Sequence, residues 1–410
     1  MNRRRFLAGT ACLALATAGS QALARRNLWN PCRAALPPAI ANHDLLHAAW
    51  DGLDPAQVWD SHAHLAGVGD GDSGIAINPR MLSPLHPAEY FQRLFYLNAG
   101  CAHDAPGKVD QSYVERLHNL AEGMESGFKL LLFAFERTHD SAGRPRPDLT
   151  AFHVPNDYAR NLARAHPAFF EWACSIHPWR EDCVEALETA AQEGARAVKW
   201  LPPAMGIDPA SPRCDRFYAA LARLDLPLIT HAGEEKAVHG AGRPEWGNPL
   251  RLRRALDQGV RVVVAHCASL GQDLDEDRGR SARKLPSFSL FARLMSERRH
   301  EGRLFGDISA ITLRNREVST LRTLLQRDDW HPRLLFGTDY PLPGILPLIS
   351  ARQLAHEKLL PAAAVPVLES LREHNPLLFD FVLKRHLRAG PARFADPVFE
   401  TRPFFERTPA

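Results

Sequence analysis

Two histidines one residue apart, His62 and His64, close the run Val58-Trp59-Asp60-Ser61-His62-Ala63-His64, where a short strand is expected to end. Side chains on an extended strand alternate between its two faces, so residues i and i+2 point the same way. Both imidazoles then converge on one spot, and neutral imidazole is a ligand for Zn²⁺ and similar divalent ions. The pair predicts the start of a metal site.

Four further side chains that can bind a metal or move a proton stand in similar positions. They lie in, at or just past the ends of other apolar runs: Lys199, His231, His266 and Asp339. In a barrel of parallel strands such ends meet around one opening, where the active site is built. Imidazole and carboxylate suit a divalent ion, whereas a charged ammonium repels one. The ordered set therefore predicts a centre for a divalent metal ion, Zn²⁺ or a similar one.

Plainer roles stay open for some of these residues. Lys199 could bind a substrate carboxylate or a nearby acid as an ordinary lysine, and Asp339 could cap a turn before Pro341. Weaker candidates for contacting substrate or supporting an imidazole are His177, Arg180, Glu234, Glu235 and Asp307. For Arg180 a surface salt bridge is favoured, and for Asp307 a turn or supporting role.

The candidate residues are carried by apolar runs that alternate with amphipathic helical patterns. The runs lack polar alternation, as expected for strands buried on both faces of a parallel sheet. They cover residues 57–62, 129–135, 171–176, 195–201, 227–231, 261–266, 304–308 and 333–338. Eight strand–helix units in order predict an α/β fold, a (β/α)₈ TIM barrel. An open doubly wound sheet is the alternative, but its glycine-rich first turn is missing.

The first expected strand is followed by a long loop insertion, residues 65–112, which opens with several glycines and aspartates. Such an insertion at the active face of a barrel usually makes a lid or a substrate wall. We expect the barrel itself over residues 56–385. An N-terminal flanking segment, 25–55, and a C-terminal tail, 386–410, should wrap its outside.

The ordered strand-end residues resemble the amidohydrolase superfamily, in particular its amidohydrolase-related branch, over about residues 57–345. The resemblance implies that His62, His64 and Asp339 bind metal. It also implies that His231 is a ligand in one- and two-metal members.

The same resemblance gives two further residues a role. It implies that His266 binds a second metal or, in single-metal members, assists catalysis. A lysine at the position of Lys199, carboxylated by CO₂, bridges two metals in phosphotriesterase-like members. Carboxylation would remove the positive charge of Lys199 and add oxygen donors.

These roles suggest a hydrolytic reaction and leave two alternative functions open. A divalent ion lowers the pKa of bound water from about 16 towards about 7. Asp339 can accept that proton and pass it to the leaving group, and His266 can polarise the carbonyl if it is not a ligand. We expect a hydrolase in which metal-activated water attacks a C–N or C–O acyl bond of a small molecule. A non-oxidative decarboxylase and an inactive periplasmic binding protein are the alternatives.

The amino-terminal residues 1–24 predict an export signal. They contain Arg3-Arg4-Arg5-Phe6-Leu7, an apolar stretch and the small-residue pattern Ala22-Leu23-Ala24. The order of these residues resembles a twin-arginine signal, which implies a periplasmic protein exported in the folded state. An ordinary secretory signal or an uncleaved anchor is the alternative.

Composition restricts the partners. Without residues 1–24 the chain has 47 basic and 47 acidic residues, and no basic stripe points to nucleic acid. No other segment predicts a membrane span, and assembly into a homo-oligomer is left open. The remaining cysteines lack CxxC spacing and are interpreted as small buried residues more than as a disulfide framework, with one pair still open. They are Cys32, Cys101, Cys174, Cys183, Cys214 and Cys267.

Overall fold

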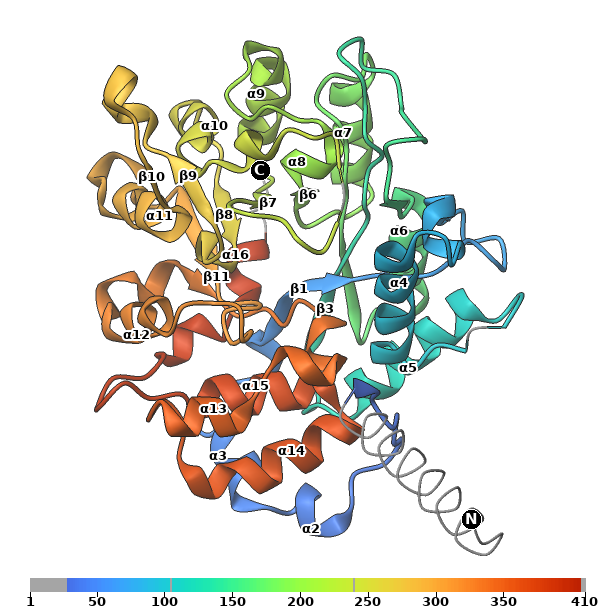
Figure 1. Ribbon diagram of the computed structural model, residues 1–410, viewed down its shortest axis with the longest axis vertical. Coiled ribbons are helices and arrows are strands. Elements are labelled where there is room, and N and C mark those ends of the chain that lie inside the picture. Colours follow the sequence, from blue (N-terminus) through green and yellow to red (C-terminus); the bar gives the residue numbers. More distant parts are fainter. Residues whose placement is uncertain (1–27, 104, 239, 407–410) are drawn as a thin grey trace, which may run out of the picture.

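Parallel strands form the centre of the structure, a computed structural model that describes residues 28–406 except residues 104 and 239. Each of the eight predicted runs contains or overlaps one strand. These strands are β1 (Trp59–His64), β3 (Lys129–Phe133), β5 (Phe170–Ala173), β6 (Val198–Trp200), β7 (Leu228–His231), β8 (Val262–Ala265), β11 (Leu304–Asp307) and β12 (Leu334–Leu335). The expected α/β class is confirmed, with helices arranged around these strands (Figure 1).

The strands pair in the order in which they occur along the chain. One parallel sheet has the order β1-β3-β5, and a second has the order β12-β11-β8-β7-β6. Two isolated parallel bridges connect the sheets, one between Cys174 and Val198 and one between Ala63 and Tyr340. The backbone N–H of Ser61 also donates to the carbonyl of Phe336 at 3.0 Å. Hydrogen-bonded neighbours therefore run from β1 to β12 and back to β1.

Alternating side chains of the strands face a common interior. A buried inner cluster takes residues from six of these strands, from the position just before β6 and from the C-terminal tail: Trp59, Leu131, Phe133, Ala173, Ala197, Ile229, Val263, Leu335 and Phe405. Phe405 stacks on Trp59, with ring centroids 6.5 Å apart, at the amino-terminal end of β1. The tail therefore fills the inside of this end as well as following the outside.

Helices and short strands cover the outer faces and connections. The predicted apolar stripes lie on α7 (Cys183–Gln192), α9 (Asp215–Arg223) and α12 (Val318–Gln326), with Leu187, Leu221 and Leu321 buried. The other helices that follow the strands are α5 (Val109–Glu122), α6 (Asn156–Ala165), α8 (Pro202–Met205), α10 (Arg253–Asp257), α11 (Ser287–Ser296), α13 (Ala351–His356), α14 (Val365–His374), α15 (Pro376–His386) and α16 (Arg402–Phe405). A small antiparallel pair, β9 (Gln272–Leu274) and β10 (Lys284–Pro286), precedes α11.

The insertion after β1 contains regular elements. It includes β2 (Ala76–Ile77), α4 (Pro87–Ala99) and the start of α5. β2 pairs antiparallel with β4 (Phe152–His153), which fixes the insertion to a segment that follows β3. α4 stands beside the carboxyl end of β1 (Figure 1).

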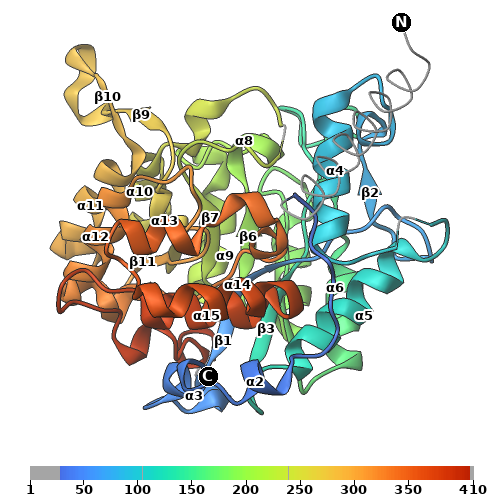
Figure 2. The same ribbon diagram turned by 60° about the horizontal axis from the view of Figure 1, so that its bottom comes forward.

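The N-terminal flanking segment packs against the last long helices. It forms α2 (Pro38–Ala41) and α3 (Asp44–Trp50), which lie beside α14 and α15 (Figure 2). Nε2 of His386 lies 2.8 Å from the carbonyl of Leu45, and Nε of Arg385 donates to the carbonyl of Ala49 at 2.6 Å. Residues 1–24, the expected signal, lie outside the described residues.

The cysteines divide into two groups. Cys32 and Cys101 form a disulfide between the flanking segment and the end of α4, a single pair of the kind that the sequence left open. The interpretation as small buried residues is confirmed for Cys174, Cys183, Cys214 and Cys267. The disulfide joins residues 69 apart, a contact that depends on the folded chain. None of the helices in the described part of the chain has the length and apolar composition that a membrane crossing needs.

Candidate active site

Three of the predicted ligands meet at the carboxyl end of the strands. The Nε2 atoms of His62 and His64 lie 3.3 Å apart. Oδ1 of Asp339 is 3.4 Å from Nε2 of His62 and 3.1 Å from Nε2 of His64. Two imidazole nitrogens and a carboxylate oxygen this close together fit the donor set of a divalent ion such as Zn²⁺. These three residues form a candidate metal site.

An irregularity in β1 turns the two histidines inward. The pairing of β1 with β3 shifts between Asp60 and Ala63. Trp59 packs in the inner cluster, and the rings of His62 and His64 lie 4.8 and 5.4 Å from the ring of Phe133, another member of that cluster. A bulge changes which residues share a face. It therefore lets Trp59 and the histidine pair point to the same interior.

Asp60 fixes the first and last strand ends to each other. Its Oδ1 accepts the backbone N–H of His62 at 3.0 Å and that of Thr338 at 2.8 Å, and its Oδ2 accepts the hydroxyl of Thr338 at 2.5 Å. Asp339 follows directly, with φ of +60°, a region that non-glycine residues rarely occupy. Such backbone strain is concentrated at functional sites.

Asp307, at the end of β11, supports two of the histidines. Its Oδ2 lies 2.8 Å from Nδ1 of His62, and its Oδ1 accepts the backbone N–H of His266 at 2.8 Å. Burial opposes ionisation, but the neighbouring ring of His62 and its hydrogen bond hold the pKa of Asp307 below its usual range. His62 therefore donates through Nδ1 and keeps the lone pair of Nε2 free for the site. Both carboxylate oxygens are occupied, which favours the supporting role expected from the sequence.

His266 faces the same place from the end of β8. Its Nδ1 lies 2.7 Å from Oγ and 3.1 Å from the carbonyl of Ser309, and its Nε2 lies 3.7 Å from Oδ2 of Asp339. A carbonyl only accepts, so Nδ1 carries the proton and Nε2 presents a lone pair in neutral His266. This tautomer suits a ligand or proton acceptor better than a donor to a carbonyl. Its backbone φ is +54°.

His231, at the end of β7, has one ring nitrogen that no described residue contacts by a hydrogen bond. Its ring centroid is 5.6 Å from that of His266, and its Nδ1 lies 3.4 Å from Oε2 of Glu235. Nε2 is buried and has no hydrogen-bond partner among the described residues. Burial, and then the charge of Lys199, lower the pKa of His231 to about 3, so its imidazole is neutral at pH 7. An unpartnered buried imidazole nitrogen fits the place of a metal ligand.

Lys199, in β6, is buried beside His62. Its Nζ is 3.0 Å from Nε2 of His62 and 4.7 Å from the centroid of Phe133. Burial lowers the pKa of Lys199 to about 8, although Asp307 and Asp339 oppose the shift. All six residues predicted from strand ends thus lie around one place.

The neighbouring histidines affect the ionisation of Asp339. Burial would raise its pKa, but the neighbouring His266, His62 and His64 hold it well below the usual range. Asp339 is therefore an ionised carboxylate at neutral pH. It is able to accept a proton and to bind a cation.

Several weaker candidates lie elsewhere. The ring centroids of His177 and His139 lie 4.4 Å apart, and Nδ1 of His177 accepts the backbone N–H of Trp179 at 3.2 Å. Arg180 pairs with Glu136 at 2.8 Å and with an aspartate on its own loop. Neither His177 nor Arg180 lines the cavity described next. Sγ of Cys267, the residue after His266, contacts the carbonyl of Asp307 and is buried.

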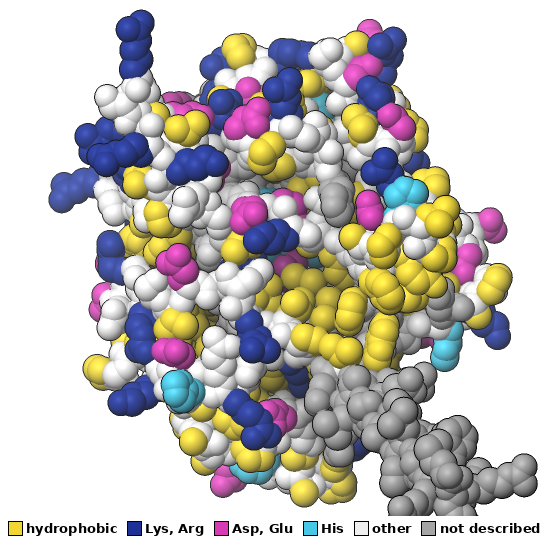
Figure 3. Space-filling model, in the orientation of Figure 1, with side chains coloured by type: hydrophobic (Ala, Val, Ile, Leu, Met, Phe, Trp, Pro, Cys, Tyr) yellow, Lys and Arg dark blue, Asp and Glu magenta, His cyan; other side chains and the backbone are white. Residues whose placement is uncertain are grey.

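A cavity of about 560 Å³ opens above the six residues, which form part of its floor. The insertion supplies one wall through β2 and α4, with Phe95 and Leu97 among the lining side chains. In the space-filling view a hollow beside α4 has mainly hydrophobic walls (Figure 3). Arg316 also lines the cavity. Sequence reasoning missed this residue, because nothing in Arg314-Asn315-Arg316 distinguishes one arginine from the other.

Comparison with known proteins adds a family match. A family model described as "Amidohydrolase" matches residues 59–366. No match is found among curated proteins.

Solved structures with a similar fold share little sequence with this chain. One is an uncharacterised TIM-barrel protein from Bordetella bronchiseptica, 17% identical, with a TM-score of 0.44 and coverage of 76% of this chain and 98% of that one. A putative 2-pyrone-4,6-dicarboxylic acid hydrolase from Pseudomonas putida is 17% identical, with a TM-score of 0.41 and coverage of 79% and 97%. 5-Carboxyvanillate decarboxylase from Sphingomonas paucimobilis is 12% identical, with a TM-score of 0.40 and coverage of 79% and 96%.

Proposed function

Since the chain belongs to the amidohydrolase family, whose model matches residues 59–366, we propose that it is a metal-dependent hydrolase of a C–N or C–O acyl bond in a small molecule. The observation that carries this proposal is the convergence of His62, His64 and Asp339 at the floor of the large cavity. The buried, unpartnered Nε2 of His231 supports it further.

We propose that His62, His64, His231 and Asp339 hold one divalent ion, most simply Zn²⁺. When bound, the ion supplies a water of lowered pKa and polarises a substrate carbonyl. Lys199, if carboxylated, and His266 would hold a second ion. The lone pair that His266 directs to the site through Nε2 supports that assignment.

The proposed proton carrier is Asp339. Its carboxylate is ionised, lies at the floor of the cavity and has neutral imidazoles on two sides. It can accept a proton from the attacking water and return it to the departing nitrogen or oxygen. Asp60 and Asp307 keep the backbone of Asp339 and the ring of His62 in place.

A non-oxidative decarboxylase is the second candidate function. The same histidines and Asp339 would serve it, and the cavity holds a cationic side chain, Arg316, which suits an acid substrate. A hydrolase must deliver water to a carbonyl, whereas a decarboxylase must seat a carboxylate and protonate carbon. The third possibility is a binding protein without turnover.

Metal quantification on the purified protein, followed by a substrate screen, separates these functions. Two metals per chain, with one lost in Lys199→Ala and turnover of amides, esters or lactones, supports the dinuclear hydrolase. One tightly held metal with CO₂ release from aromatic acids supports the decarboxylase. If the wild type binds stoichiometric metal but turns over none of these substrates, the result supports the binding protein. Lys284→Ala, on the exposed β10 strand, is the matched control.

The proposal includes a complete (β/α)₈ barrel and export by the twin-arginine route. The two bridges that connect the sheets support the barrel. The disulfide between Cys32 and Cys101 supports an oxidising compartment such as the periplasm, since disulfides are rare in the reducing cytosol.

A further inference from the structure

The cavity has room for a large apolar body. Its volume of about 560 Å³ falls in the range of pockets that enclose drug-sized ligands. Side chains on several elements give it apolar walls: Phe95 and Leu97 on α4, Phe152 on β4, and Leu201, Leu313 and Leu348 on loops. Burial of a hydrocarbon or aromatic group against these walls is favourable.

One cation in this apolar cavity has no hydrogen-bond or ion-pair partner among the residues that the structure describes. The guanidinium of Arg316 makes no hydrogen bond or ion pair with any described residue, and its Nε is buried. Arg372, buried elsewhere, instead donates to backbone carbonyls, including those of Pro343 at 2.7 Å and Ile345 at 2.6 Å. A half-buried charge without a partner is costly, and an anion from outside would relieve that cost.

The acidic side chains that line the cavity near Arg316 contact other groups. Glu235 accepts the backbone N–H of Val238 at 3.0 Å and lies 3.4 Å from Nδ1 of His231. Glu234 lies 3.4 Å from Nζ of Lys236. The carboxylate of the candidate metal site contacts imidazoles. None of these acids is within ion-pair distance of Arg316 among the described residues.

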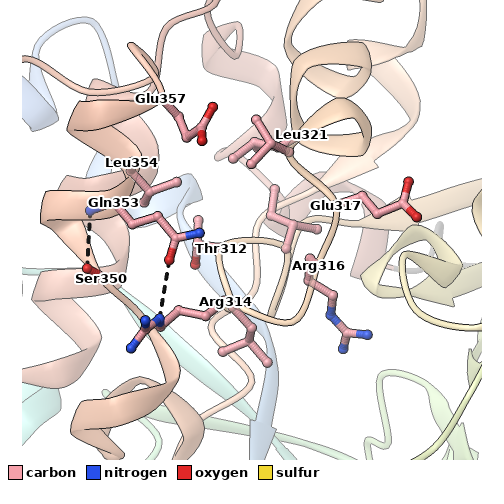
Figure 4. A pocket seen from close by; sticks show the side chains of 12 residues that line it. Thr312, Arg314, Arg316, Glu317, Leu321, Ser350, Gln353, Leu354 and Glu357 are labelled. Carbon is pink, nitrogen blue, oxygen red and sulfur yellow. Dashed lines mark hydrogen bonds between the residues drawn. The ribbon is translucent and has the colours of Figure 1, made fainter.

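Arg316 faces the candidate active site, whereas Arg314 in the same loop faces away from it. Nε of Arg314 donates to Oε1 of Gln353 at 3.2 Å, beside a small cavity of about 20 Å³ that both arginines line (Figure 4). The Arg316 side chain points in another direction (Figure 4) and lines the large cavity. Burial and Lys199 contribute most to the lowered pKa of His231, and Arg316 adds to them, as expected for a charge on this side of the loop.

We propose that the site takes an amphipathic organic anion, whose apolar body fills the cavity and whose carboxylate pairs with Arg316. The reacting acyl bond then lies at the floor beside His62, His64 and Asp339. A planar guanidinium can bind a carboxylate through two parallel hydrogen bonds, which also orients the molecule. The position of the reacting acyl bond rests on the proposed function, whereas binding of the anion by Arg316 does not depend on it.

Equilibrium binding tests the proposal without turnover. The probes are 2-naphthylacetate and its neutral amide, 2-naphthylacetamide, titrated by calorimetry into the purified protein with its metal content unchanged. We expect the wild type to bind the carboxylate about tenfold tighter than the amide. Arg316→Gln should reduce this preference to about twofold or less, and Arg316→Lys should retain only part of it.

Arg314→Gln is the matched control, because it removes a similar charge from the same loop on the side facing Gln353. It should keep the full preference. Arg316→Gln should keep the thermal unfolding midpoint of the wild type, since Arg316 has no protein partner to lose. Equal preference in the wild type and Arg316→Gln would overturn the role of Arg316. No binding of either probe, or no preference in the wild type, would overturn the anionic substrate class.

Failure of this inference differs from failure of the proposed function. Turnover of neutral and anionic esters with equal kcat/KM would keep the hydrolase and reject the anion. An Arg316-dependent preference for the carboxylate without any turnover would keep the anion site and reject the hydrolase.

Discussion

Oδ2 of Asp307 lies 2.8 Å from Nδ1 of His62, the ring nitrogen that faces away from the candidate metal site. This carboxylate therefore sets both the tautomer and the direction of the ring. Because Asp307 also accepts the backbone N–H of His266, one side chain orients two candidate ligands from two strands.

Asp307→Asn should weaken metal binding without removing a ligand. An amide accepts less strongly than a carboxylate, so His62 becomes less basic and less fixed, and affinity should fall about 10- to 100-fold. Competition with a chelating dye measures this change. The exposed Asp328→Asn is the control. Unchanged affinity in Asp307→Asn would show that the hydrogen bond does not support the site.

His64→Ala should abolish stoichiometric metal and activity while the protein stays folded. His64 is partly exposed at the end of β1, and its ring mainly contacts His62, Asp339 and Phe133. Its loss removes one donor from the candidate site and little core packing. Metal content and circular dichroism are the measurements, with His356→Ala on α13 as the control. A variant that keeps its metal would remove His64 from the ligand set.

Asp339→Asn should reduce turnover far more than metal content. The substitution removes the charge that accepts a proton, and general acid–base groups contribute about 10² to 10⁴-fold to rate. One ligand oxygen remains, so part of the metal should stay bound. Steady-state kinetics on protein with measured metal content separates the two effects. Full activity in this variant would contradict the proposed proton transfer.

The pKa of His231, lowered to about 3 by burial, predicts acid sensitivity of the metal-free protein. The unfolded chain binds a proton near pH 6.5 and the folded one does not, so stability falls as pH decreases from about 7. Between pH 7 and pH 5 this group alone should cost about 2 kcal/mol.

Urea unfolding of the protein, after a chelator has removed its metal, measures the free energy of unfolding at pH 7 and pH 5. His231→Gln, which cannot be protonated in this range, should show a smaller loss than the wild type. The other site histidines are also buried, with lowered pKa values, so part of the loss remains in the variant. An identical pH dependence in both proteins would contradict the assignment to His231.

The strands and the six strand-end residues could be predicted because each is identified by a pattern within a few neighbouring residues of the sequence. A buried parallel strand shows an uninterrupted apolar run, and residues at its carboxyl end face a common opening. The bulge in β1 was not predictable. Simple alternation places His62 and His64 on one face, but it gives no sign that Trp59 joins them.

Other features depended on contacts between distant segments. Cys32 and Cys101 carry no spacing signal, and only the position of α4 brings them together. The insertion was identified by its length, while α4 and the pairing of β2 with β4 follow from its packing. Arg316 and Arg314 look alike in sequence and differ only in the side of the loop to which each points.

The bracing of His62 and Thr338 by Asp60 joins segments 278 residues apart. Two candidate ligands come from near the start of the folded region and a third from close to its end, so a partly synthesised chain cannot assemble all three. Capture of a cation by all three residues would then require that synthesis has passed Asp339. Metal content in a series of C-terminally shortened chains would fall abruptly rather than in steps.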